Sequence, residues 1–220
     1  MAVTSRRPCR TTLETILDHR PAAVRWMVPL LAVLFLAAPL AAQETGHGLS
    51  KAEEIALAEG AGPPALVAGA TIYVLGEHGY ETAREGVNGA SCLVSRDRID
   101  TLEPLCFDAE GTRAILPVYL ERGRLRAAGM SDQQIEERMA AAFASGEYVA
   151  PAKPGIAYML SPHNKVFNGT EVISYPPHIM VYAPYATNAD IGSEMTDPFM
   201  PWVLNEGDPH AYIIVVVGGR

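Results

Sequence analysis

The stretch SCLVSRDRIDTLEPLCFD, residues 91–108, holds two cysteines, Cys92 and Cys106, and they are the only cysteines after residue 42. SCLVSR and EPLCFD have the composition of short strands, and the polar residues DRIDTL between them favour a turn. A hairpin would bring the two sulfurs together, and a disulfide would then close a loop of about fifteen residues. We therefore predict a disulfide-linked hairpin. The alternative is that one cysteine is a nucleophile beside a histidine.

A segment typical of an export signal precedes this hairpin. Residues 26–43 are uncharged and mostly apolar, and five arginines stand before them. A basic start, a short apolar core and a small-residue end predict a cleaved signal peptide over 1–42 and a mature chain over 43–220. The alternative is an uncleaved anchor over 26–43, although two prolines interrupt that run. We thus expect a secreted or periplasmic protein, or a membrane-anchored one that contacts the membrane through this segment alone.

The mature part of the chain is acidic. Residues 1–42 contain five of the 17 basic residues and two of the 25 acids, so residues 43–220 contain 12 basic and 23 acidic residues, a net charge of −11. Such a surface repels phosphate backbones, which argues against a nucleic-acid partner. A small molecule or an envelope protein is the expected partner.

Helices are predicted after Ser50 and Ser131, because each serine is followed three residues later by a capping partner, Glu53 or Gln134. A further helix is predicted over 117–128, with Pro117 at its first position. Strands are predicted over 70–75, 155–161, 178–186 and 211–219. This order indicates a single α+β domain with a mixed or antiparallel sheet, helices grouped in the middle of the chain and one disulfide-linked hairpin.

Three further segments give expectations that a structure can test. Residues 76–91 contain several glycines, but not at nucleotide-binding spacing, and we predict a short helix between turns there. Residues 108–113, DAEGTR, are expected to form a turn. AYIIVVVGG, residues 211–219, is an almost continuous apolar run, which is typical of a strand that is covered on both faces.

The strand over 178–186 places His178, Met180 and Tyr182 on one face, and Ile179, Val181, Ala183 and Tyr185 on the other. We expect the face of Ile179 and Val181 to be the core face. The face of His178 would then contact a helix layer or a cleft. Because His178 and Tyr182 are about 13 Å apart along the strand, any catalytic partner of His178 must come from another segment.

Several titratable side chains occur near the ends of the predicted strands. The candidate catalytic residues are His163, His178, Tyr182 and Asp190, and the candidate metal ligands are His163, His178, Asp208 and His210. Three such ligands could hold a zinc ion that activates a water molecule, although the spacing matches no local zinc motif. The alternative is structural, because histidine and aspartate are common in turns, where they bond nearby backbone groups.

The long connection over 193–212 contains apolar residues among acids, namely Met195, Phe199, Met200 and Trp202. If they are exposed, they would suit an apolar ligand or a protein partner. If they are buried, the connection simply folds over the core.

The strings NGASCLVSR, EPLCFDAEG, PGIAYMLSP and PPHIMVYAPYATNADIG resemble those of a group of exported, signal-peptide-bearing bacterial proteins to which no activity is assigned. The resemblance covers most of residues 50–218 and implies one exported domain that contains both cysteines. It implies no reaction. The leading hypothesis is a non-enzymatic binding or envelope-associated protein without a cofactor. The alternative is a hydrolytic or zinc-assisted enzyme that uses His178 with His163, Asp190 or His210.

Overall fold

The computed structural model describes residues 48–96, 100–194, 196–197 and 199–217, and the structural statements below refer to these residues. The predicted signal peptide over 1–42, and the alternative anchor over 26–43, lie outside them. Within the described ranges, none of the helices is both long and apolar enough to span a membrane.

The domain is built on a mixed sheet of eight strands in the order β2-β1-β3-β4-β5-β8-β10-β9. β1 and β3 are parallel, and the other neighbouring strands are antiparallel. The predicted α+β fold is confirmed. The strands of this sheet are β1 (Thr71–Gly76), β2 (Gly79–Arg84), β3 (Ser91–Ser95), β4 (Glu103–Phe107), β5 (Ile156–Met159), β8 (His178–Tyr182), β9 (Trp202–Leu204) and β10 (Tyr212–Val216).

The predicted disulfide-linked hairpin is confirmed and lies within the sheet. Cys92 of β3 is directly opposite Cys106 of β4, their sulfurs are bonded, and both residues are fully buried. A second, separate hairpin consists of β6 (Lys165–Phe167) and β7 (Val172–Ser174).

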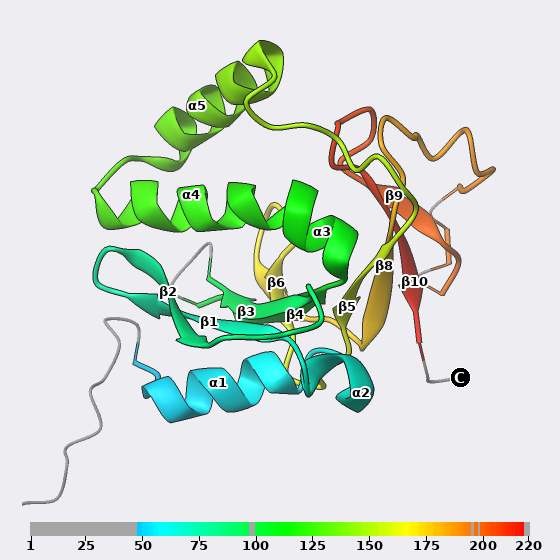
Figure 1. Cartoon of the computed structure of the whole chain (residues 1–220). Coiled ribbons are helices and arrows are strands. Elements are labelled where there is room, and N and C mark those ends of the chain that lie inside the picture. The colour runs from blue at the N-terminus through cyan, green and yellow to red at the C-terminus, as the bar shows by residue number, and fades with distance from the viewer. Residues whose placement is uncertain (1–47, 97–99, 195, 198, 218–220) are drawn as a thin grey trace, which may run out of the picture. The chain divides into compact units, whose positions relative to one another are not determined.

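Helices lie on both sides of the sheet (Figure 1). On one side, α1 (Lys51–Glu59) packs against β1, β3 and β4, and α2 (Pro64–Val67) follows it. On the other side, α3 (Ala109–Ala114) packs on β4, α4 (Leu116–Ala127) packs on β2, and α5 (Asp132–Ser145) packs on α4. Both predicted capping boxes, at Ser50 and Ser131, are present.

Two local predictions are wrong. Residues 79–84 form strand β2 instead of a helix, because Gly79, with φ at 112°, allows a two-residue turn that pairs β2 with β1. Residues 109–114 form α3 instead of a turn. The carboxylate of Asp108 caps this helix by accepting a hydrogen bond from the Gly111 N–H at 2.9 Å.

The predicted faces of the C-terminal strands are also wrong. In β8, Met180 and Tyr182 are buried against the core under α3 and α4, whereas Val181 is only half-buried. β10 alternates in the same way, so it is covered on one face and not on both. The apolar run that suggested a doubly covered strand therefore places several large aliphatic side chains on a face with little cover.

Candidate functional site

The predicted site residues on β8 and β10 lie at opposite ends of these strands. His178 is opposite Val216, and Tyr182 is opposite Tyr212. His210 lies two residues before Tyr212, so the strands separate it from His178 by more than about 13 Å. His163 follows β5 at the end where Met159 pairs with His178. The structure therefore places His163 and His178 at one end of the sheet and His210 at the other.

His178 has a structural environment. Its side chain is buried, Nδ1 donates a hydrogen bond to the Pro176 carbonyl at 2.9 Å, and its ring meets the ring of Tyr175 edge-on at 4.9 Å. Burial lowers the pKa of His178, which favours the neutral imidazole.

His163 and Asp190 are exposed residues in turns. The backbone N–H of His163 donates to Ser161 Oγ at 3.1 Å. The carboxylate of Asp190 accepts hydrogen bonds from the hydroxyl and the N–H of Thr187, both at 2.8 Å, and these bonds lower the pKa of Asp190. The contacts match the structural alternative for such residues.

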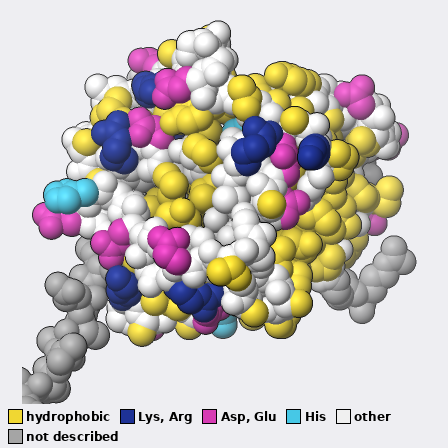
Figure 2. Space-filling view, viewed as in Figure 1, with side chains coloured by type: hydrophobic (Ala, Val, Ile, Leu, Met, Phe, Trp, Pro, Cys, Tyr) yellow, Lys and Arg dark blue, Asp and Glu magenta, His cyan; other side chains and the backbone are white. Residues whose placement is uncertain are grey.

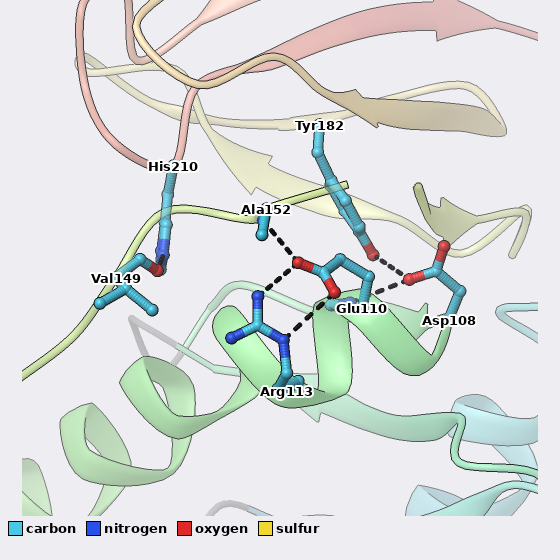
Figure 3. A network of polar contacts seen from close by, with 8 residues as sticks. Asp108, Glu110, Arg113, Val149, Ala152, Tyr182 and His210 are labelled. Carbon is cyan, nitrogen blue, oxygen red and sulfur yellow. Dashed lines mark hydrogen bonds and ion pairs between the residues drawn. The ribbon is translucent and has the colours of Figure 1, made fainter. Parts of the chain in front are cut away.

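Tyr182 belongs to a junction between β8, α3 and β5. Its hydroxyl donates to Asp108 Oδ1 at 3.0 Å (Figure 3). Asp108 Oδ2 accepts from the Ile156 N–H at 2.9 Å. Burial, together with the Asp108 charge, raises the pKa of Tyr182 well above its ordinary value. Any larger residue at position 111 would clash with this hydroxyl, since a Cβ there would lie 2.1 Å from the hydroxyl oxygen. The junction is tightly packed and holds the three elements together.

No group of three or more His, Cys, Asp and Glu side chains that could hold a metal ion occurs in the described part of the chain. Asp208 and His210, two of the four candidate ligands, do line the same pocket. The other two, His163 and His178, are not among its lining residues.

The apolar residues of the 193–212 connection have different environments. Met195 lies outside the described residues, and Phe199 and Met200 are exposed. Trp202 instead begins β9, where it is half-buried and its Nε1 donates to the Tyr175 hydroxyl at 3.2 Å. Only part of this connection therefore offers apolar side chains to a ligand or partner.

A pocket of about 470 Å³ lies between α4, α5 and the segment that leads into β10. Its size is in the range of small-molecule sites. Two helices and one loop line it, with Val118, Tyr119 and Arg122 from α4, Glu136, Met139, Ala140 and Phe143 from α5, and Asn205, Asp208, Pro209, His210 and Tyr212 from the C-terminal segment.

The polar groups of this pocket are arranged by neighbouring contacts. Arg122 binds both carboxylate oxygens of Glu136, and this pairing lowers the pKa of Glu136. His210 Nε2 donates to the Val149 carbonyl at 3.2 Å, and its ring meets Phe143 edge-on at 4.7 Å. Burial lowers the pKa of His210, so its imidazole is predominantly neutral near pH 7.

The backbone that positions His210 is itself fixed to α3. Glu110 pairs with Arg113 and also accepts a hydrogen bond from the Ala152 N–H at 2.6 Å (Figure 3). These contacts hold the segment after α5, which includes the Val149 carbonyl, against α3. The imidazole of His210 is thus bonded to an anchored part of the backbone.

A second candidate is an apolar surface on the other side of the sheet. We call it the bare face, and it consists of Ile156, Ile179, Val181, Ile213 and Val215. All five are half-buried, and within the described part of the chain none of them belongs to a buried core cluster or packs against one. In Figure 2, hydrophobic side chains gather over the region of β5, β8 and β10.

The bare face has clear borders. α1 covers β1, β3 and β4 on this side, and Tyr158 of β5 packs against the cluster beneath α1. At the other edge, Val203 of β9 is buried, and its N–H donates to Asn188 Oδ1 at 2.7 Å. Contiguous apolar surface is a feature of protein and membrane interaction sites, which makes the bare face the second candidate.

Comparison with known proteins found no matching family model, no similar curated protein and no similar solved structure.

Sequence reasoning missed most residues of both sites. Met139 and Phe143 lie on the apolar face of α5, a pattern that does not distinguish pocket from core. Nothing local indicated that Arg122 and Glu136 would meet beside them. For the bare face a signal did exist, namely the apolar run over 211–219. It was interpreted as two-sided burial.

Proposed function

We propose that residues 43–220 form an exported, non-enzymatic binding domain, and that its bare face docks a helical segment of an envelope protein. The observation that carries this proposal is the uncovered row of aliphatic side chains on β5, β8 and β10. Water contact with these side chains is unfavourable, so a partner that covers them gains free energy roughly in proportion to the apolar area removed.

The dimensions of the bare face favour one helix as its occupant. Three strands at about 4.8 Å spacing and about 13 Å length give a footprint of roughly 200 Å². A stable dimer needs about 800 Å² on each partner, which is several times more. A helix is about 10 Å wide, and α1 already covers the neighbouring strands on this side. A partner helix would continue that layer.

Charge favours a basic partner over a second copy or a lipid surface. The net charge of −11 on residues 43–220 opposes self-association and is repelled by anionic lipid headgroups. A helix with an apolar stripe between lysine or arginine residues would match both the bare face and the surrounding charge.

Export is supported by two independent features. The N-terminal pattern of residues 1–42 is that of a signal peptide. The buried Cys92–Cys106 disulfide is typical of proteins that fold in an oxidising compartment. Cell fractionation with N-terminal sequencing tests this part: we expect a form that starts near residue 43 outside the cytoplasm, and a full-length membrane band would show the anchored form instead.

The docking surface is tested with a synthetic amphipathic peptide that has a leucine stripe flanked by lysines. Calorimetry should show saturable binding to the wild type and at least tenfold weaker binding to Ile213→Lys. Val87→Lys is the matched control, because Val87 is 95% exposed and lies outside the bare face. Equal weakening in both variants would show that charge alone drives binding and would contradict the proposal.

A photo-crosslinking residue placed at position 213, and separately at position 87, tests the same surface in cells. We expect a discrete adduct with one envelope protein at position 213 alone. A homodimer adduct, or cosedimentation with phosphatidylglycerol vesicles that Ile213→Lys abolishes, would replace the helical partner with a second copy or a lipid surface.

A further inference from the structure

A different ligand class fits the pocket between α4, α5 and residues 205–212, on the opposite side of the sheet. We propose that this pocket binds a small organic amine, with a cationic ammonium group and an apolar or aromatic body. The inference does not depend on the docking of a partner at the bare face.

Two open polar groups of the pocket, on Asp208 and His210, are hydrogen-bond acceptors, and the carboxamide of Asn205 can both donate and accept. The Asp208 side chain is exposed and receives no hydrogen bond from the described residues. His210 uses Nε2 as a donor to the Val149 carbonyl, which leaves a lone pair on Nδ1. A ligand that supplies N–H donors, and a positive charge near Asp208, satisfies both groups.

An anionic ligand fits less well. Arg122 is the cation of the pocket, and both carboxylate oxygens of Glu136 already bind it. A ligand carboxylate would have to displace Glu136 and would also be repelled by Asp208. The charges of Arg122 and Glu136 cancel, so Asp208 gives this pocket a net negative charge.

The remaining lining suits the body of an amine. Tyr119, Phe143 and Tyr212 place three aromatic rings around the pocket, and Met139 adds a flexible apolar side chain. Aromatic rings attract cations through their faces, and they also pack against apolar or aromatic ligand groups. The volume of about 470 Å³ accommodates a ligand of this size.

The test compares two probes of similar size and opposite charge, phenethylamine and 3-phenylpropionate, by calorimetry at pH 7.5. We expect phenethylamine to bind at one site per chain and 3-phenylpropionate to bind at least tenfold more weakly. Asp208→Asn should weaken phenethylamine binding at least tenfold. The variant should fold normally, because the backbone of Asp208, and not its side chain, makes the hydrogen bonds of this loop.

Glu85→Gln is the matched control, since it also removes one exposed negative charge but lies after β2, outside the pocket. It should leave phenethylamine affinity within twofold of the wild type. His210→Gln should weaken binding as well, because it removes the Nδ1 acceptor. Three results would overturn the proposal: no binding of phenethylamine, tighter binding of 3-phenylpropionate, or equal effects of Asp208→Asn and Glu85→Gln.

Discussion

The two halves of the sheet are covered differently. β1, β3 and β4 contact α1 on one side, α3 and α4 lie on the other side of this half, and every residue of β3 is buried. β5, β8 and β10 alternate between buried and half-buried residues, and the half-buried ones form the bare face. Both halves are rich in Val, Ile and Leu. The difference shows that, among the described residues, an apolar strand need not be covered equally on both faces, and the proposed docking uses the less covered face.

The largest expected effect is the difference in stability between two truncations, one in each half of the sheet. Leu93→Ala on β3 removes a fully buried side chain and leaves a cavity, so it should lower the free energy of unfolding by about 2–5 kcal/mol. Val181→Ala on the bare face leaves no enclosed cavity and should lower it by about 1 kcal/mol or less. Urea unfolding of both variants measures the difference, and equal losses would show that the bare face is in fact core.

The disulfide of the covered half gives the next largest effect. Replacing Cys92 and Cys106 together by alanine opens the covalent loop, whose ends are 14 residues apart. The unfolded chain gains conformational freedom, so the free energy of unfolding should fall by about 3 kcal/mol. Under conditions where the variant remains folded, the amphipathic peptide should still bind. Loss of peptide binding by folded protein would mean that the two halves are coupled.

Close cover by α1 also buries a carboxyl group. Glu54 is fully buried, and Oε1 accepts a hydrogen bond from the Leu75 N–H at 2.8 Å, whereas Oε2 has no hydrogen-bond partner among the described residues. Burial raises the pKa of Glu54 to about 7 from its ordinary value of 4.5. The folded state therefore holds this proton more tightly than the unfolded state does, and stability should fall as the pH rises from about 4.5 through 7.

Glu54→Gln tests this pH dependence. Glutamine stays neutral and keeps an acceptor for Leu75, so the variant should gain roughly 3 kcal/mol of stability relative to the wild type between pH 4 and pH 8. Carboxyl groups whose pKa is lowered, such as that of Glu136, change the stability at lower pH, and they are present in both the wild type and Glu54→Gln. If the stabilities of the two proteins changed with pH in the same way, the raised pKa of Glu54 would be refuted.

Local sequence signals predicted a large part of the fold but little of the sites. The cysteine hairpin and the caps at Ser50 and Ser131 depend on residues close in sequence, and all three are present. β2 and α3 were missed because glycines at 79 and 111 suggested turns or breaks. At position 79 the glycine makes the hairpin turn, and at position 111 it leaves room for the Tyr182 hydroxyl, 74 residues from Asp108.

The sites depend on which elements meet in space, and a local pattern does not contain that information. Period-two alternation correctly separated His178, Met180 and Tyr182 from Ile179 and Val181. It could not show which set faces the helices. The assignment required the position of α3 and α4 over Met180, which is known only from the three-dimensional arrangement of the described residues.

The smallest expected effect comes from one nearly isosteric substitution made in each half. Val94→Thr on β3 buries a hydroxyl where the valine is fully buried, and it should lower the free energy of unfolding by about 1–3 kcal/mol. Val215→Thr keeps the β-branched shape on the half-buried bare face, where water can reach the hydroxyl, so the change should stay within about 0.5 kcal/mol. Chemical denaturation measures both values, and calorimetry with the amphipathic peptide should show weaker binding to Val215→Thr alone. A side chain that contributes little to the stability of its own domain, yet strengthens binding, makes its main contacts with the partner. Unchanged peptide affinity in Val215→Thr would instead place the docking contacts elsewhere on the domain.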